Sequence, residues 1–412
     1  ELRQCPVTVK ETYYTQAQAH GMMETYRAFS YFDHAGRMTV VSSTQIPFHV
    51  RRQLARALQF PASKIRVIKP RIGGGFGGKQ TGAVEMFAAI VTQRTGKPAM
   101  IIYDRTETFS CTSSRHAMRL TVRIGADEDG MIRAIDIQGL SDGGAYGEHS
   151  PTTFAVVADK TLPLYNKTKA MRFSGHVVYT NKMPGGALRG YGATQGTFAL
   201  ESAVNLLAGK LQMDSCELRL KNLIRAGEYS PVYKGKVLAS STLDQCIATG
   251  RQMIGWDEKF PARDLGDKIR AVGMAVTMQG SGIAGIDTAS AEIRLNDDGN
   301  YTLLLGSTDM GTGSDTILAQ MAAEVLQTEL DNIIVNAADT DVSPYDPGSY
   351  ASSTTYVTGM AVKLAAEELL GKMLAQAAEM LTAAKDDLTF DGSMFASKDG
   401  SQTLTLAKLA ET

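Results

Sequence analysis

Glycine-rich turns are the first chemical signal in this sequence, because they let the backbone come close to a ligand. The three turns at residues 73–80, 190–196 and 311–316 each come before an expected helix. Backbone N–H groups at the start of a helix can hold an anion such as phosphate. A single turn of this kind is more often only a tight bend. Three of them, with the Ser/Thr-rich residues 351–355, indicate a ligand with phosphates that touches several loops.

The glycine spacing does not fit the common nucleotide-binding motifs. A P-loop requires G-x-x-x-x-G-K-[ST], but Lys79 is followed by Gln80. Gly73, Gly75 and Gly78 have the spacing G-x-G-x-x-G, yet no simple βαβ unit follows them. We therefore expect a large cofactor that lies across two domains.

Side chains that commonly bind metals show no ligand pattern. The cysteines stand far apart and include no C-x-x-C pair, so we expect neither zinc nor iron–sulfur ligation within this chain. Cys111 is expected to be a small buried residue. The histidines include no H-x-x-x-H pair, and these are expected to be structural or exposed: His34, His49, His116 and His149.

The elements that would position these residues can be assigned from hydrophobic periodicity and turn signals. Strands are expected within 8–43 and at 64–70, 99–105, 116–142, 176–180, 289–307 and 332–340. Helices are expected at 49–60, 84–96, 197–211, 317–327 and 360–385, with a loop-like stretch at 226–267. Mixed strands and helices with several hairpins favour an α+β fold. We predict a first domain at 1–240, a linker at 241–267 and a second domain at 268–412.

The composition excludes several classes of function. A chain of 412 residues, 43% hydrophobic and 21% charged, is ordinary for a globular protein of more than one domain. The net charge of −1 gives no strong field for nucleic acid or an acidic membrane. No apolar run is long enough to span a membrane, and sparse cysteines suit the cytoplasm. The chain begins with Glu1 and not Met, so we expect a fragment or a processed product.

Several ordered motifs resemble one family. GGGFGG at 73–78, ALRGYGATQ at 187–195 and DMGTGSDT at 309–316 resemble the molybdenum cofactor-binding region of the xanthine dehydrogenase/aldehyde oxidase family. STQIP at 43–47 and SYASSTTYVTGMAV at 349–362 fit the same pattern in the same order. The resemblance covers nearly the whole chain.

This resemblance implies a fold and a chemistry. The fold is a pair of α+β domains that clasp molybdopterin, usually as its cytosine dinucleotide. Members of the family hydroxylate a carbon next to nitrogen in N-heterocycles, or oxidise aldehydes, with water as the oxygen source. Electrons leave through iron–sulfur clusters and FAD on other domains or subunits, and the assembled complex is expected to be a homodimer.

The resemblance also assigns residues around the metal. The backbone of Gly75, Phe76 and Gly77 would lie against the oxo group of molybdenum, and Gly74 belongs to the same turn. Gln45 matches the family glutamine that hydrogen-bonds an oxo ligand. No side chain of the protein is expected to coordinate the metal directly. Phe76 would form a dry wall beside it.

Further positions match the cofactor and substrate loops. Arg189 matches a residue whose backbone approaches the cofactor. Tyr191 stands where many relatives have Phe, an aromatic residue that packs on a flat substrate ring. Gly311, Thr312 and Gly313 match an MGQG turn, but Thr312 replaces the glutamine whose amide contacts the pterin.

The last segment carries small and hydroxyl residues. Ala351, Ser352, Ser353 and Thr354 match the loop that lines the cofactor, where small residues allow close approach and hydroxyls can bind phosphate or pterin. Gln80 stands where xanthine-specific relatives often have Glu, and its amide can both donate and accept hydrogen bonds at a heterocycle edge. The resemblance thus favours an N-heterocycle such as a purine over an aldehyde.

The general base of the family, a glutamate in a G-x-G-E segment, has no match in this chain. RAGE at 225–228 lies in the expected interdomain stretch, so the glutamate is expected beyond Thr412 and no catalytic residue is assigned within the chain. We therefore expect the chain by itself to be inactive.

Alternative readings remain open. Thr312 and the missing glutamate are compatible with a non-catalytic scaffold of the same fold that has lost the metal. An aldehyde oxidoreductase of the same family is another alternative. A general nucleotide-binding protein is disfavoured, because neither an intact P-loop nor a clean Rossmann unit is present.

Overall fold

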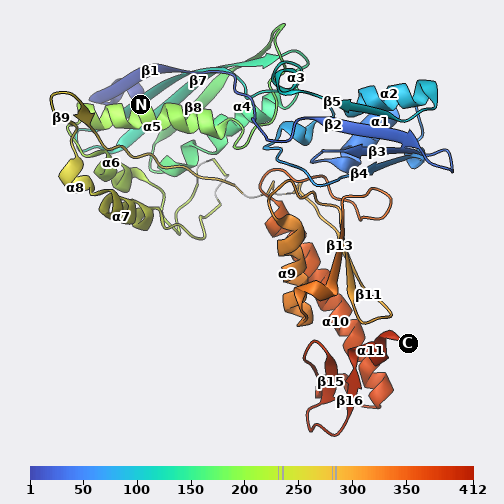
Figure 1. Ribbon diagram of the computed structural model, residues 1–412. Coiled ribbons are helices and arrows are strands. Elements are labelled where there is room, and N and C mark those ends of the chain that lie inside the picture. The colour runs from blue at the N-terminus through green and yellow to red at the C-terminus, as the bar shows by residue number, and fades with distance from the viewer. Residues whose placement is uncertain (231, 234–235, 281, 284) are drawn as a thin grey trace. The chain divides into compact units, whose positions relative to one another are not determined.

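The computed structural model describes residues 1–230, 232–233, 236–280, 282–283 and 285–412 (Figure 1). The chain forms two compact units, and each unit is built from two separate segments of the chain. The first unit consists of Glu1–Ala19 and Ser113–Gln279, and the second of His20–Thr112 and Gly280–Thr412. The predicted domain boundaries at 1–240, 241–267 and 268–412 stay a prediction.

The first unit contains a four-stranded sheet in the order β1-β6-β7-β8. The strands are β1 (Val7–Thr15), β6 (Met118–Ala126), β7 (Ile132–Gly144) and β8 (Ala170–Tyr179). Neighbours pair antiparallel except β7 and β8, which are parallel. Leu120, Val122 and Ile124 alternate along β6 and are all buried in the core, as expected for a strand with one face inward. A short pair, β9 (Arg263–Asp264) and β10 (Ile269–Arg270), lies later in this unit.

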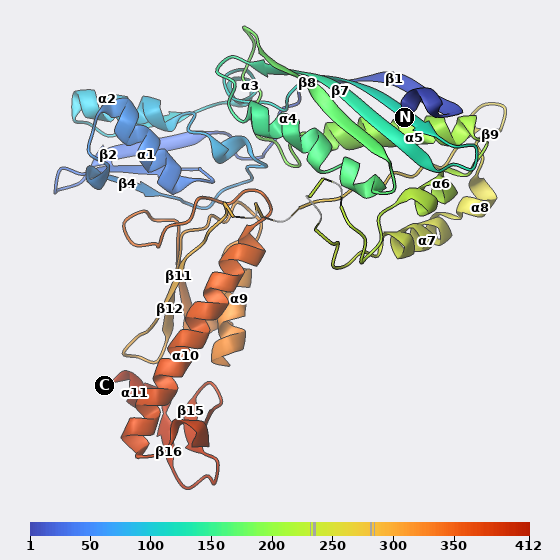
Figure 2. The same cartoon turned by 180° about the vertical axis from the view of Figure 1, so that it is seen from behind.

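Helices cover this sheet. Helix α5 (Ala193–Lys210) packs on β1 and β6, and α4 (Ser150–Asp159) packs against α5, β7 and β8 (Figures 1 and 2). Gly196 lies where α5 meets α4, since a Cβ there would lie 2.5 Å from the carbonyl oxygen of Val157. Gly196, which belongs to the glycine-rich turn at 190–196, therefore allows the two helices to pack closely. The unit also contains α6 (Ser215–Asn222), α7 (Leu243–Ile254) and α8 (Trp256–Lys259).

The second unit begins with a sheet in the order β4-β3-β2-β5. Its strands are β2 (Arg27–Phe32), β3 (Met38–Ser42), β4 (Ile65–Ile68) and β5 (Ala99–Ile102), and its helices are α1 (Pro47–Leu58), α2 (Glu85–Thr95) and α3 (Arg105–Ser110). The predicted helix at 49–60 is observed as α1, whose Val50, Leu54 and Leu58 are buried at four-residue spacing.

The later part of this unit is built on a second sheet. Strands β11 (Ala291–Leu295), β12 (Tyr301–Leu305) and β13 (Ile333–Ala337) form it, with β11 antiparallel and β13 parallel to β12. The helices α9 (Ser314–Leu326) and α10 (Gly359–Leu381) lie side by side beside it (Figures 1 and 2). The chain continues through β14 (Leu388–Phe390), β15 (Met394–Ser397), β16 (Thr403–Thr405) and α11 (Leu406–Ala410).

Charged pairs join the distant segments of the second unit. Arg66 Nε lies 3.0 Å from Asp339 Oδ1, and Arg37 Nη2 lies 2.8 Å from Asp341 Oδ1. A backbone bridge also links Ile68 to Asp339. These contacts hold the end of β4 beside the segment that follows β13, and so place the loops of both segments near one another.

Some local expectations are wrong. The stretch 226–267 is not only loop, because it contains α7 and α8, although Ile247 is the one fully buried residue described in α7. The expected strand at 99–105 ends at Ile102, because Asp104 caps α3 through a capping box with Glu107. Cys111 is exposed and not buried. Across the described part of the chain, no helix is both long and apolar enough to cross a membrane.

Candidate functional site

Gln45 lies at the centre of the predicted cofactor loops in the second unit, and its side chain is only 1% exposed. Its Oε1 accepts a hydrogen bond from the Gly77 N–H at 3.0 Å, and its Nε2 donates to the Ser349 carbonyl at 2.7 Å. Its backbone N–H donates to the Lys79 carbonyl at 2.9 Å. One side chain thus fastens the glycine turn to a segment 304 residues away in the chain. Gln45 is therefore a buried organising residue of this unit.

The glycine turn needs its glycines for contacts inside the protein. A Cβ on Gly75 would overlap Gln45, lying 3.0 Å from its Cδ. Gly74 and Gly77 have φ of 95° and 100°, which glycine adopts without the strain that other residues meet. Phe76 has φ of 51° and is 45% exposed, so it is no core aromatic and its ring is available to a ligand.

A buried ion pair also stabilises the glycine turn that begins at Gly73. Lys79 is 1% exposed, and its Nζ lies 2.8 Å from Glu24 Oε2. The Gly73 N–H donates to that same oxygen at 2.8 Å, and the Glu24 N–H donates to the Gly73 carbonyl at 3.0 Å. Burial lowers the pKa of Lys79, while the bond to Glu24 opposes that shift. Sequence reasoning missed this pair, since nothing local connects the two positions.

The turn before α9 differs from the expectation of free N–H groups. Asp309 Oδ1 accepts hydrogen bonds from the N–H groups of Gly311 at 2.8 Å and Thr312 at 3.1 Å. It also lies 3.3 Å from the Gly313 nitrogen, and Oδ2 accepts from the Asp315 N–H at 3.2 Å. Burial raises the pKa of Asp309, but these donors outweigh it and hold the pKa below its ordinary value. The expectation of a free anion site here is wrong, because a side chain of the protein fills it.

The other two glycine turns also differ from a simple anion cradle. After residues 73–77 comes a short 3-10 turn at Gly78–Gln80, and α2 begins only at Glu85. The second turn does lead into α5, but Gly192 and Gly196 pack against α4 there. Gln80 is 8% exposed and its N–H donates to the Gly77 carbonyl at 3.2 Å.

The segment before α10 is a bent, close-packed loop. Ala351 and Ser352 have φ of 53° and 56°, and Thr354 begins a π-helical turn, Thr354–Thr358, that runs into α10. Ser353 is buried, and its hydroxyl donates to the Tyr350 carbonyl at 2.9 Å. π-Helical turns are frequent at functional sites. Ser352 is exposed, whereas Ala351 and Thr354 are half-buried.

These loops of the second unit converge. Besides the contacts of Gln45, the Thr308 N–H donates to Ser349 Oγ at 2.8 Å. A Cβ on Gly311 would lie 3.9 Å from the carbonyl oxygen of Ile72, so the third turn approaches the first. The structure therefore gathers the predicted residues at 45, 74–77, 311–313 and 351–354 in one compact unit.

The remaining predicted residues, Arg189 and Tyr191, lie in the first unit. Arg189 is exposed, and its carbonyl accepts a hydrogen bond from Arg115 at 2.9 Å. Tyr191 has φ of 49°, and its ring lies 6.1 Å from that of His149. Sequence reasoning missed both Arg115 and His149 as neighbours of this turn.

Two histidines of this unit, His116 and His149, have pKa values lowered by burial. His116 is 1% exposed, its Nε2 lies 2.9 Å from Ser150 Oγ, and burial lowers its pKa to about 4. Burial also lowers the pKa of His149. In the part of the chain that the structure describes, no cluster of three or more His, Cys, Asp or Glu side chains could hold a metal ion.

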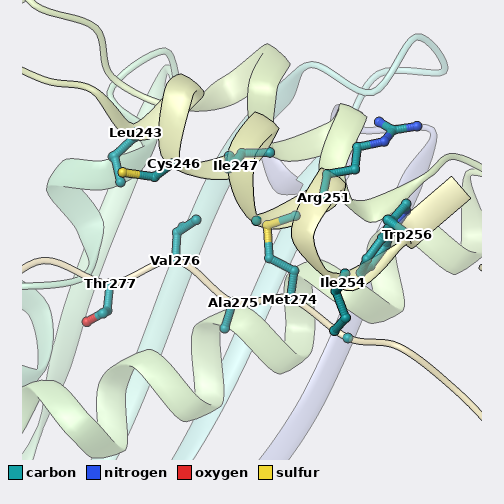
Figure 3. Close-up of a pocket in the computed structure, with 12 residues that line it drawn as sticks. Leu243, Cys246, Ile247, Arg251, Ile254, Trp256, Met274, Ala275, Val276 and Thr277 are labelled. Carbon is teal, nitrogen blue, oxygen red and sulfur yellow. The ribbon is translucent and has the colours of Figure 1, made fainter.

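A cavity of about 390 Å³ in the first unit contains none of the predicted site residues (Figure 3). It lies between α7 and residues 273–277, and its lining is mostly apolar, with Ile247, Trp256 and Val276 from the hydrophobic core. Arg251 at its side is already paired with Glu217 at 2.6 Å. The cavity therefore carries no chemistry that competes with the converging loops.

The converging loops fit the cofactor that the sequence motifs imply. Gly313 has no heavy atom within 4 Å of the place where a Cβ would stand, so a ligand can approach its backbone. The exposed ring of Phe76 and the small residues Ala351 and Ser352 offer an apolar wall and close approach for a flat pterin. The Nε2 group of Gln45 has a second hydrogen beyond the one given to Ser349.

Comparison with known proteins agrees with this fit. Residues 1–223 and 249–412 each match a molybdopterin cofactor-binding domain family. A probable hypoxanthine oxidase of Escherichia coli O157:H7 is 37% identical over 385 residues, covering 91% of this chain and 40% of that protein. A xanthine dehydrogenase molybdenum-binding subunit of the same organism is 36% identical over 387 residues, covering 92% of this chain and 51% of that protein.

A solved structure matches along the whole length of the chain. Quinoline 2-oxidoreductase from Pseudomonas putida 86 has a TM-score of 0.87 and 22% identity, covering 100% of this chain and 55% of that chain. At this identity the match concerns the fold alone. The chain spans about half the length of the proteins it matches, with 40%, 51% and 55% covered.

Proposed function

Because the chain belongs to the xanthine dehydrogenase/aldehyde oxidase family of molybdenum hydroxylases, we propose that it is the molybdopterin-binding part of an enzyme that hydroxylates an N-heterocycle such as a purine. Water would be the oxygen donor, and electrons would pass to iron–sulfur and FAD partners. The observation that carries the proposal is the buried Gln45, which joins the glycine turn to the Ser349 segment. The buried amide fixes the backbone next to the exposed ring of Phe76. A surface loop without a ligand would not need such a fixed backbone.

The cofactor would be molybdopterin, in its cytosine dinucleotide form. Gln45, the turn at 74–77, the turn at 311–313 and the loop at 351–354 would hold it. When bound, it supplies the two-electron oxidation chemistry. The residues of this chain bind and orient it: Gln45 has an amide hydrogen to donate, the ring of Phe76 excludes water, and the glycines admit close contact.

A purine is the proposed substrate class for two reasons. Relatives that match over most of this chain are described as a probable hypoxanthine oxidase and a xanthine dehydrogenase subunit. Gln80 and Tyr191 are the proposed substrate residues, since an amide matches the donors and acceptors of a heterocycle edge and an aromatic ring packs on its face.

The rest of the enzyme would lie outside this chain. We propose that the general-base glutamate belongs to a further part of the subunit, since this chain spans only 40% and 51% of its curated relatives. Iron–sulfur and FAD chains would assemble with it as a cytoplasmic homodimer.

A scaffold that has lost the metal is the second candidate. One observation favours it: Asp309 already occupies the N–H groups of residues 311–313, and Thr312 stands where relatives have the pterin-binding glutamine. In that case the converging loops would serve only to join the segments of the second unit.

Elemental mass spectrometry separates the candidates. The protein would be purified from its native host with every chain that co-purifies, and its molybdenum would be compared with the amount of this chain. Molybdenum equal to the chain in amount, with faster turnover of hypoxanthine than of an aldehyde, is the expected result. Absence of molybdenum in cells whose other molybdoenzymes are loaded would refute the proposal and favour the scaffold. Loaded enzyme that oxidises only aldehydes would overturn the purine assignment alone.

A further inference from the structure

Arg115 lies against the inner side of the turn at 189–195 in the first unit. Its Nη2 donates to the Arg189 carbonyl at 2.9 Å. Its Nη1 donates to the Tyr191 carbonyl at 2.8 Å and to Thr194 Oγ1 at 2.6 Å. A planar guanidinium can reach both carbonyls at once because its donors point in fixed directions. One side chain therefore clamps the backbone on both sides of Gly190.

The clamped turn has a conformation that needs support. Gly190 has φ of 88°, and Tyr191 has φ of 49°, in the left-handed region that a tyrosine rarely adopts. The Tyr191 N–H donates to the Leu188 carbonyl at 2.7 Å, which closes the turn but does not fix where it lies. The bonds from Arg115 supply that fixed point.

Arg115 is itself held in place. Its N–H donates to the Gln18 carbonyl at 2.9 Å, and Gln195 Nε2 donates to the carbonyl of the next residue, His116, at 3.1 Å. Within the described residues its guanidinium has no carboxylate partner, so carbonyl and hydroxyl oxygens are its acceptors. A guanidinium that donates to backbone carbonyls, and not to a carboxylate, is suited to holding a loop in one position.

From this geometry we infer that Arg115 is a positioning residue that sets the place of the Tyr191 ring, and with it the affinity for a flat heterocyclic substrate. The inference rests on the proposed function, in which Tyr191 packs on the substrate ring. The ring of His149 lies 6.1 Å from that of Tyr191, with an angle of 42° between the two ring planes. Displacing the backbone of residues 189–191 would move the Tyr191 ring while leaving its chemistry intact.

The test replaces Arg115 by Gln and by Lys in the complete enzyme, purified with its partner chains. Amide hydrogen exchange of residues 188–196, molybdenum content and steady-state kinetics with hypoxanthine are measured together. For R115Q we expect faster exchange in this segment and a fall in kcat/KM of roughly 10- to 100-fold, mostly through KM, because a small misplacement has a large kinetic effect. R115K should lie between R115Q and the wild type, since an ammonium cannot span both carbonyls. Molybdenum content should not change.

Arg119→Gln is the matched control, because Arg119 is an exposed arginine on β6, four residues after Arg115 in the chain. If R115Q fails to fold, T194V removes one acceptor and should give a smaller change in the same direction. Unchanged exchange at 188–196 overturns the inference, and so does faster exchange with an unchanged KM. A wild-type enzyme without activity on any heterocycle refutes the proposed function instead. This failure is seen in the wild type, whereas a failure of the inference about Arg115 is seen only in the variants.

Discussion

Replacing Gly75 by Ala should destabilise the second unit by an amount that the structure allows us to estimate. The added Cβ would overlap the side chain of Gln45, so the glutamine must move. Its two hydrogen bonds at risk are those with the Gly77 N–H at 3.0 Å and the Ser349 carbonyl at 2.7 Å. A buried hydrogen bond that is lost with its partner left unsatisfied costs about 1–3 kcal/mol, so we expect a loss of about 2–4 kcal/mol in unfolding free energy.

Pulse proteolysis in urea would measure this loss of unfolding free energy. The peptides that the protease releases from the second unit report how much of that unit is unfolded at each urea concentration. Trp256, the single tryptophan of the chain, lies in the first unit, so its fluorescence should report no shift. Gly209→Ala is the control, because Gly209 lies in α5 with no heavy atom within 4 Å of an added Cβ. That change should be neutral or slightly stabilising.

A double-mutant cycle tests the cause. In a Gln45→Ala background the side chain that obstructs the new Cβ is gone, so Gly75→Ala should cost much less than in the wild type. Equal costs in both backgrounds would refute the reasoning, because the strain would then come from the backbone and not from the glutamine.

Two further predictions concern buried charges. Lys79→Met should lower the unfolding free energy of the second unit by about 3 kcal/mol, because it leaves the Glu24 carboxylate without its ammonium partner. Urea denaturation measures this change. The double mutant Glu24→Gln with Lys79→Met should recover part of the lost unfolding free energy. His116→Gln should flatten the pH dependence of the first unit's stability between about pH 4 and 6.5, followed by Trp256 fluorescence in urea. The folded-state pKa of His116 is lowered to about 4, so its stabilising contribution is present above the unfolded pKa and is lost as pH falls.

Controls for these changes lie on the surface. Lys97 is exposed, so Lys97→Met should leave stability almost unchanged. His34 lies in the second unit, so His34→Gln should leave the profile of the first unit, followed by Trp256, unchanged. A double mutant of Glu24 and Lys79 no better than Lys79→Met would contradict the ion-pair argument. A profile for His116→Gln identical to the wild type would contradict the titration argument.

Much of this protein follows from the sequence, because its signals are local. Apolar spacing places α1, the hairpin of β11 and β12, and the long α10 within a few residues of where they lie. The ordered glycine and serine motifs identify the family, since each motif is a short run whose residue types suffice. Elements such as α7 and β14–β16 are not predicted, because the glycines and prolines around α7 are typical of a loop and the three strands are only three or four residues long.

The contacts that make the site are decided only by the tertiary structure. Gln45 meets Ser349 across 304 residues, Lys79 meets Glu24 across 55, and Arg115 meets Arg189 across 74. Local propensity carries no information about which distant groups will share a hydrogen bond, since that depends on how the sheets and helices pack. The same holds for the turn before α9, whose glycines indicate an anion but whose anion is Asp309. The sequence by itself thus determined which loops bear the chemistry, and the packed fold determined which groups in them remain available to a ligand.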